Sequence, residues 1–139
     1  MKSSKIIAVD FDGTIVEDAY PKIGKPRLFA FETLKRFENE GYRLTLWTYR
    51  SGKPLEEAVD FCKKNGIEFY AVNNSFEGED FDKNEQSRKI NADYFVDDRN
   101  VGGFPGWGEV YECITKRKTL DFEKAERIKK KKKKGLFRF

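Results

Sequence analysis

Short apolar runs alternate with stretches of helical periodicity along most of the chain. Runs rich in β-branched residues predict four short buried strands, at 5–9, 42–48, 67–72 and 92–96. Between the first two runs, apolar residues at every third position predict an amphipathic helix that ends near Gly41. The apolar positions of this helix are Leu28, Phe31, Leu34 and Phe37.

Four further helices are predicted. Pro54 suits the first turn of a helix that ends near Gly66 and buries the small side chain of Cys62. Shorter helices are predicted over 84–90 and from Trp107 through Ile114, and a last one begins near Leu120. Residues 73–82 are polar and without periodicity, which is typical of a loop.

The alternation of short buried strands with helices predicts the fold class. It favours an α/β, three-layer, Rossmann-like fold with a central parallel sheet. We find no internal repeat and no second core, which predicts a single body over 1–118. The basic residues 119–139 are predicted to form a separate helix or tail. At 139 residues, the chain has the length of one domain.

Composition excludes several classes of site. The chain has no histidine, which removes Ser-His-Asp and Cys-His catalysis and histidine-based zinc sites. Its two cysteines form no disulfide framework, and no apolar run is long enough to cross a membrane. The first residues lack the apolar stretch of a signal peptide, so we expect a cytoplasmic protein.

The charge is unevenly distributed. Residues 116–139 contain 12 Lys or Arg against 3 Asp or Glu, whereas the whole chain has a net charge of only +4. The tail includes a run of six lysines from Lys129 to Lys134, and the body before it is mildly acidic. Such a run is typical either of an arm that binds nucleic acid or of a solvated terminus, and the sequence leaves both interpretations open.

Candidate chemistry collects where three of the predicted strands end. The first is followed by Asp10-Phe11-Asp12-Gly13-Thr14, the second ends in Thr48-Tyr49-Arg50-Ser51-Gly52, and the fourth is followed by Asp97-Asp98-Arg99. Ligands bind at the carboxyl ends of the strands of such a sheet. Four neighbouring carboxylates repel one another without a cation, and Mg²⁺ is the natural partner because it prefers oxygen ligands.

These groups can divide the steps of a phosphoryl transfer. A carboxylate beside Mg²⁺ stays ionised and can attack phosphorus, and a second one can protonate the leaving oxygen and then activate water. Thr48 and the cations Lys89 and Arg50 are candidates to hold the phosphoryl oxygens. Each also has an ordinary structural interpretation, as a turn, a strand end or a solvated surface side chain.

The ordered set resembles the haloacid dehalogenase-like (HAD) phosphatase superfamily. Asp10-Phe11-Asp12-Gly13-Thr14 is similar to its first motif, and the apolar strand ending at Thr48 is similar to its second. Lys89 is the best match for the third motif, with Lys83 and Arg88 as rivals. The acidic pair after Tyr94-Phe95-Val96 matches the fourth, so the resemblance covers roughly residues 5–100.

The resemblance implies a role for each matched residue. Asp10 would be the nucleophile that forms an aspartyl-phosphate, and Asp12 the general acid and base. Thr48 would bind the phosphoryl group and Lys89 would neutralise its charge. The implied Mg²⁺ ligands are Asp10, Asp12 through its backbone carbonyl, Asp98 and, through water, Asp97; the candidate substrate-binding residues are Arg50, Ser51 and Gly13.

The chain also resembles the small branch of the superfamily without a cap domain. The segments between motifs are too short for a folded cap, so we expect a large phosphorylated substrate or closure by a second subunit of a homo-oligomer. A loop over 20–26 is expected at the rim of the site, and exposed Phe104 and Trp107 would permit a dimer.

Two other functional readings remain open. Thr48-x-Arg50-Ser51-Gly52 resembles the phosphatase domain of polynucleotide kinase/phosphatases, which implies a nucleic-acid 3′-phosphatase as a minority reading of the substrate. A non-catalytic HAD scaffold that binds nucleic acid or a partner through its basic tail is the alternative to an enzyme.

Overall fold

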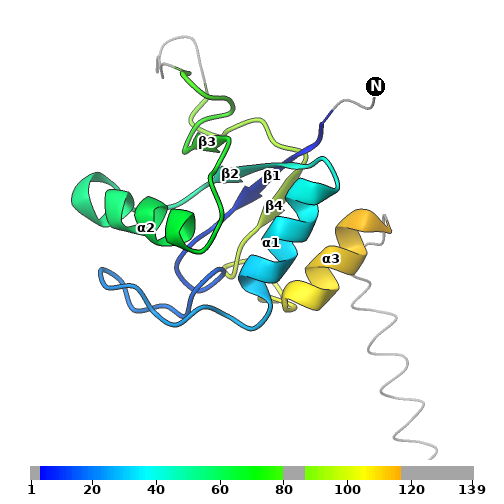
Figure 1. Cartoon of the computed structure of the whole chain (residues 1–139), viewed down its shortest axis with the longest axis horizontal. Coiled ribbons are helices and arrows are strands. Elements are labelled where there is room, and N and C mark those ends of the chain that lie inside the picture. The colour runs from blue at the N-terminus through cyan, green and yellow to red at the C-terminus, as the bar shows by residue number, and fades with distance from the viewer. Residues whose placement is uncertain (1–3, 80–86, 117–139) are drawn as a thin grey trace, which may run out of the picture.

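All four predicted strands occur in one parallel sheet. The computed structural model of the chain describes residues 4–79 and 87–116. The sheet has the order β3-β2-β1-β4, and its strands are β1 (Ile6–Val9), β2 (Arg43–Leu46), β3 (Ala71–Val72) and β4 (Tyr94–Val96) (Figure 1). In its register, Ala8 of β1 lies beside Thr45 of β2 and Phe95 of β4. The α/β Rossmann-like fold with a parallel sheet is therefore confirmed.

Three helices accompany the sheet: α1 (Ala30–Asn39), α2 (Gly52–Lys64) and α3 (Trp107–Thr115). The chain moves from β1 to β2 to β3 in one direction, and right-handed crossovers then place α1 and α2 on the same face. Rings of Phe31 in α1 and Phe61 in α2 lie 5.9 Å apart, and those of Phe37 in α1 and Tyr111 in α3 lie 5.5 Å apart. The three helices thus lie side by side (Figure 1).

The predicted third layer, with helices on the second face, is therefore not present in residues 4–79 and 87–116. All the helices that the structure describes contribute to one cluster with the alternate strand residues Ile7, Val9, Leu44 and Leu46. The opposite face of the sheet carries the small buried side chains of Ala8, Thr45 and Ala71. Alternation along the strands explains why the two faces differ.

Helix and strand boundaries differ from the prediction at several places. α1 begins only at Ala30, because Phe29 before it has a left-handed backbone (φ 65°) that cannot continue the helix. Leu28 therefore precedes α1 and is 77% exposed. The third strand is limited to Ala71–Val72, although Ile67 is buried as expected. Of the helix predicted over 84–90, residues 87–90 are not helical, and the rest lies outside the described residues.

Two predictions about single residues have opposite outcomes. Cys62 is fully buried on α2, and burial raises the pKa of its thiol to about 12, so it acts as a small apolar side chain. Trp107, expected to be exposed, is only 2% exposed, because its ring fills the core and its Nε1 donates a hydrogen bond to the Thr14 carbonyl at 2.9 Å. Trp107 therefore gives no support to a dimer interface.

Some predictions fall on residues outside the described ranges. These are the helix from Leu120, the boundary at 118/119 and the run from Lys129 to Lys134. In the part of the chain that the structure describes, no helix is both long and apolar enough to cross a bilayer.

The order of the strands reverses once in the sheet. After β1 the chain crosses to β2 on one side, whereas β4 lies on the other side of β1. In open α/β sheets, the crevice at such a reversal, outside the carboxyl ends of the strands, is where ligands bind. Here the reversal lies between the ends of β1 and β4.

Candidate active site

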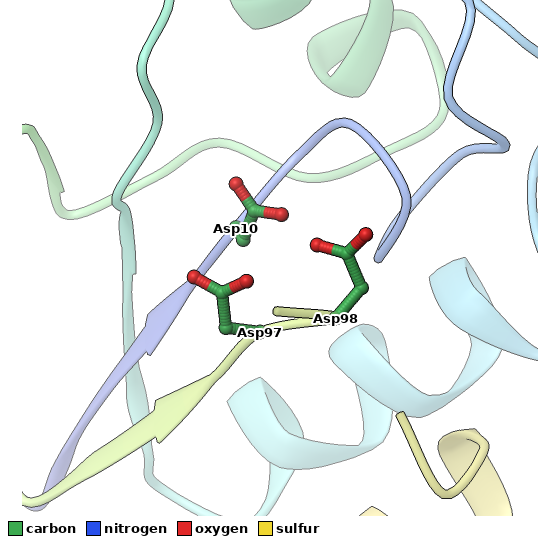
Figure 2. A group of neighbouring side chains, drawn as sticks. All are labelled: Asp10, Asp97 and Asp98. Atoms are coloured by element: carbon green, nitrogen blue, oxygen red, sulfur yellow. The ribbon is translucent and has the colours of Figure 1, made fainter. Parts of the chain in front are cut away.

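Three carboxylates converge at this reversal of strand order. Asp10 follows β1, and Asp97 and Asp98 follow β4, where they project toward the same space (Figure 2). One oxygen of each carboxylate lies within 4.8 Å of those of the other two. The backbone explains the approach, because the Asp10 N–H donates to the Val96 carbonyl at 2.9 Å and extends the pairing of the strands.

The loop after β1 is shaped to receive Asp98. Gly13 has a left-handed backbone (φ 85°), and a Cβ at this position would lie 2.1 Å from Asp98 Oδ2. The hydroxyl of Thr14, which is fully buried, donates to Asp10 Oδ2 at 3.0 Å and lies 3.5 Å from Asp98 Oδ1. Gly13 thus admits Asp98 and does not itself present a side chain to a substrate.

The electrostatics of this group favour a cation. Burial, and then the nearby charge of Asp97, raise the pKa of Asp10 from 3.8 to about 8. Without a positive charge, Asp10 therefore retains its proton near neutral pH. A divalent ion among the three carboxylates would favour their charged forms, and three oxygen donors suit Mg²⁺.

Asp12 lies near the group, but its side chain is held elsewhere. Arg50 Nε and Nη2 donate to Asp12 Oδ2 and Oδ1 at 2.8 and 2.7 Å, a bidentate ion pair with the guanidinium fully buried. The hydrogen bonds with Asp12 raise the pKa of Arg50, which keeps its charge. The side chain of Asp12 remains 16% exposed, whereas that of Arg50 is fully buried.

Arg50 differs from the predicted substrate-binding residue. Besides the ion pair with Asp12, its Nη1 donates to the carbonyls of Pro21 and Pro54 at 3.0 and 3.1 Å, and Nη2 donates to the Lys22 carbonyl at 2.7 Å. All five N–H groups of the guanidinium are thus used inside the protein. Arg50 has no donor left for a phosphoryl group, and it positions Asp12 instead.

Thr48 is fixed at the end of β2 by two hydrogen bonds. Its N–H donates to Asn73 Oδ1 at 2.8 Å, and its Oγ1 accepts from the Arg50 N–H at 3.2 Å. Because Oγ1 acts as an acceptor there, its own hydrogen can be donated to a ligand. The half-buried Thr48 therefore keeps the capacity that the sequence predicted for it.

Lys89 and Ser51 are placed less favourably. Lys89 is exposed, and its Nζ lies 5.3 Å from the centre of the Phe95 ring; among the described residues it forms no ion pair with Asp10, Asp97 or Asp98. Phe95 is on the sheet face opposite the helices. Ser51 is exposed at the N-cap of α2, where its side chain makes no capping hydrogen bond.

Three residues position parts of the site, and the sequence analysis assigned none of them this role. They are Thr14, Asn73 and Trp107. Asn73 follows β3 with a left-handed backbone (φ 55°), and its N–H donates to the Leu46 carbonyl at 2.7 Å. An asparagine directly after a predicted strand was the available signal, because asparagine tolerates this conformation and hydrogen-bonds locally.

A cavity of about 280 Å³ lies beside β4 and adjoins the carboxylate group at one residue. Its lining is largely apolar and comes from β4, α3 and the loop between them. Of the predicted site residues, only Asp97 lines it.

Comparison with known proteins gives a relative. No family model matches the chain, and no curated protein does. Among solved structures, the chain is similar to a conserved protein coded by a locus of Bacteroides thetaiotaomicron, with 51% sequence identity and a TM-score of 0.79. The match covers 84% of this chain and 94% of that one.

Proposed function

The chain belongs to the same family as the conserved Bacteroides thetaiotaomicron protein, and we propose that it is a Mg²⁺-dependent phosphomonoester hydrolase acting through Asp10. The observation that carries the proposal is the convergence of Asp10, Asp97 and Asp98 within 4.8 Å at the reversal of strand order. The resemblance to HAD phosphatases without a cap forms part of this proposal.

The donor set fits Mg²⁺. Asp10, Asp97 and Asp98 would hold the ion, since all three supply carboxylate oxygens and their mutual repulsion calls for a positive charge. When bound, Mg²⁺ would neutralise charge on a phosphoryl group and keep Asp10 ionised. Asp97 also accepts a hydrogen bond from the Arg99 N–H at 2.9 Å, which fixes its carboxylate in the turn after β4.

Asp10 is the proposed nucleophile. One carboxylate oxygen attacks phosphorus, the bond from phosphorus to the leaving oxygen breaks, and an aspartyl-phosphate remains. The Thr14 hydroxyl, at 3.0 Å from Oδ2, restricts rotation of the carboxylate and points it at the incoming phosphoryl group. Water then attacks phosphorus and restores Asp10, with release of inorganic phosphate.

Asp12 is the proposed acid and base. In its protonated form it gives a proton to the leaving oxygen, and the resulting carboxylate takes a proton from the attacking water. Arg50 binds both oxygens of Asp12 but leaves each a second lone pair. The Thr48 hydroxyl donates to a phosphoryl oxygen, and the Asn73 side chain holds the backbone that carries it.

The test is hydrolysis of p-nitrophenyl phosphate by the purified protein with Mg²⁺ and with excess chelator. We expect turnover with Mg²⁺ and none with excess chelator. In Asp10→Asn, turnover with Mg²⁺ should be lost. Asp60→Asn, on the exposed side of α2, is the matched control and should retain full activity. Absence of metal-dependent turnover over a broad panel of phosphomonoesters, in protein shown to be folded, would contradict the proposal.

A further inference from the structure

Two exposed tyrosines stand together beside the candidate active site. Tyr49 directly follows Thr48 and is 92% exposed, and Tyr20, in the excursion over 16–26, is 49% exposed. Their ring centres lie 6.4 Å apart in an edge-to-face arrangement. The excursion lies near the carboxyl ends of the strands (Figure 1). Two segments that are distant in the sequence thus bring their rings together, one of them directly after Thr48.

The position of Tyr20 depends on the group that holds Asp12. The Arg50 guanidinium carbon lies 5.3 Å from the centre of the Tyr20 ring and 5.0 Å from that of buried Phe11. The same guanidinium binds the carbonyls of Pro21 and Lys22, the two residues after Tyr20. The ring is therefore fixed relative to the proposed acid and base before any substrate arrives.

A single exposed aromatic residue is ordinary on a protein surface. This pair differs because one ring is anchored to the partner of Asp12 and the other is adjacent to the proposed phosphoryl-binding threonine. A fixed ring also loses little conformational entropy when a ligand stacks on it. An exposed ring next to the proposed phosphoryl site suits a flat group on the organic part of the phosphomonoester, because aromatic rings stack through their π faces.

We propose that Tyr20 and Tyr49 form a stacking subsite for a planar aromatic ring on the leaving group of the phosphomonoester. This inference rests on the proposed function and narrows its substrate class. The ring belongs either to the base of a nucleotide or to a phenol. Both share the flat π face that the tyrosines recognise, and they differ in how far the ring lies from phosphorus.

The test compares kcat/KM for three esters with Mg²⁺: adenosine 5′-monophosphate, ribose 5-phosphate and phenyl phosphate. Ribose 5-phosphate is the matched control, because it retains the sugar and phosphate but lacks the base. We expect at least one aromatic ester to exceed it by roughly tenfold, the scale of one stacked ring. The aromatic ester whose advantage over ribose 5-phosphate depends on Tyr49 identifies the source of the ring.

Variants then assign the preference to the tyrosines. Tyr49→Leu should remove the preference for the aromatic ester over ribose 5-phosphate, measured as the ratio of their kcat/KM values, whereas Tyr49→Phe should retain this ratio. Tyr70→Leu, at a half-buried tyrosine that precedes β3, is the control and should not change it. A thermal melt of each variant confirms that it is folded.

The possible failures are distinguishable. Equal kcat/KM for the three esters, or a preference that survives Tyr49→Leu, would overturn the stacking subsite and leave the hydrolase intact. Absence of metal-dependent hydrolysis of every ester would overturn the proposed function, and the subsite with it.

Discussion

Asp10→Asn is expected to stabilise the metal-free protein although it abolishes the proposed activity. Asp10 is half-buried beside two other carboxylates, and its pKa is raised from 3.8 to about 8. For a carboxyl group, a raised pKa means that the stability it contributes is fully present below pH 3.8 and is lost as the pH rises toward 8. Asparagine has nearly the same shape and no charge, so it removes this penalty.

The magnitude follows from the gap between the two pKa values. Each pH unit between 3.8 and 7 lowers the free energy of unfolding by about 1.4 kcal/mol. The upper limit of this loss at pH 7 is about 4 kcal/mol. Because the carboxylate is partly open to solvent, which screens its charge, we expect a gain of about 2 kcal/mol in the free energy of unfolding. For a chain of this length, that gain raises the melting temperature by roughly 8 °C.

The assay is thermal and urea unfolding in the presence of a chelator at pH 7 and at pH 4.5. The difference between Asp10→Asn and the unmodified protein should be large at pH 7 and small at pH 4.5. Mg²⁺ should stabilise the unmodified protein at pH 7 and stabilise the variant much less, because binding to the folded state alone raises stability. Asp60→Asn should show neither effect.

The reasoning would be refuted if Asp10→Asn melted at or below the temperature of the unmodified protein at pH 7 without metal. Equal stabilisation of the two proteins by Mg²⁺ would show instead that the ion binds elsewhere. These outcomes do not depend on turnover, so they test the carboxylate group separately from the hydrolase.

Three further substitutions test the surroundings of the site. Gly13→Ala places a Cβ 2.1 Å from Asp98 Oδ2, so we expect a loss of stabilisation by Mg²⁺ in thermal melts; an unchanged midpoint for Mg²⁺ would contradict the packing argument. Arg50→Lys keeps the charge but not the bidentate geometry, and should lower the free energy of urea unfolding by about 3 kcal/mol. Thr45→Val removes a buried hydroxyl that has no hydrogen-bond partner among the described residues, so it should raise that free energy by about 1 kcal/mol, and a decrease would count against it.

The parallel sheet was predictable because each strand is a short, separate apolar run. β1 and β4 were predicted within two residues of their bounds, and the strand ends located Asp10, Asp97 and Asp98. The carboxyl ends of parallel strands lie at the same end of a sheet, so the sequence located these carboxylates at that end, and their convergence follows from the pairing of β1 with β4.

The roles of the cations were not predictable in the same way. A sequence pattern locates Arg50 near the site but does not tell whether its donors face a ligand or the protein. That depends on the carbonyls of Pro21 and Lys22 in one segment and of Pro54 in another. Leu28 shows a similar limit, because the helical spacing continued past the point where the Phe29 backbone ends the helix.

The five hydrogen bonds of Arg50 have a consequence for motion. One buried guanidinium joins the loop after β1, the excursion over 16–26 and the first turn of α2. In hydrogen exchange, the amides of these three segments should become protected or exposed as one unit with a common opening free energy. Opening of the excursion would remove two of the five hydrogen bonds that fix the guanidinium, so motion of the excursion is coupled to the position of the proposed acid.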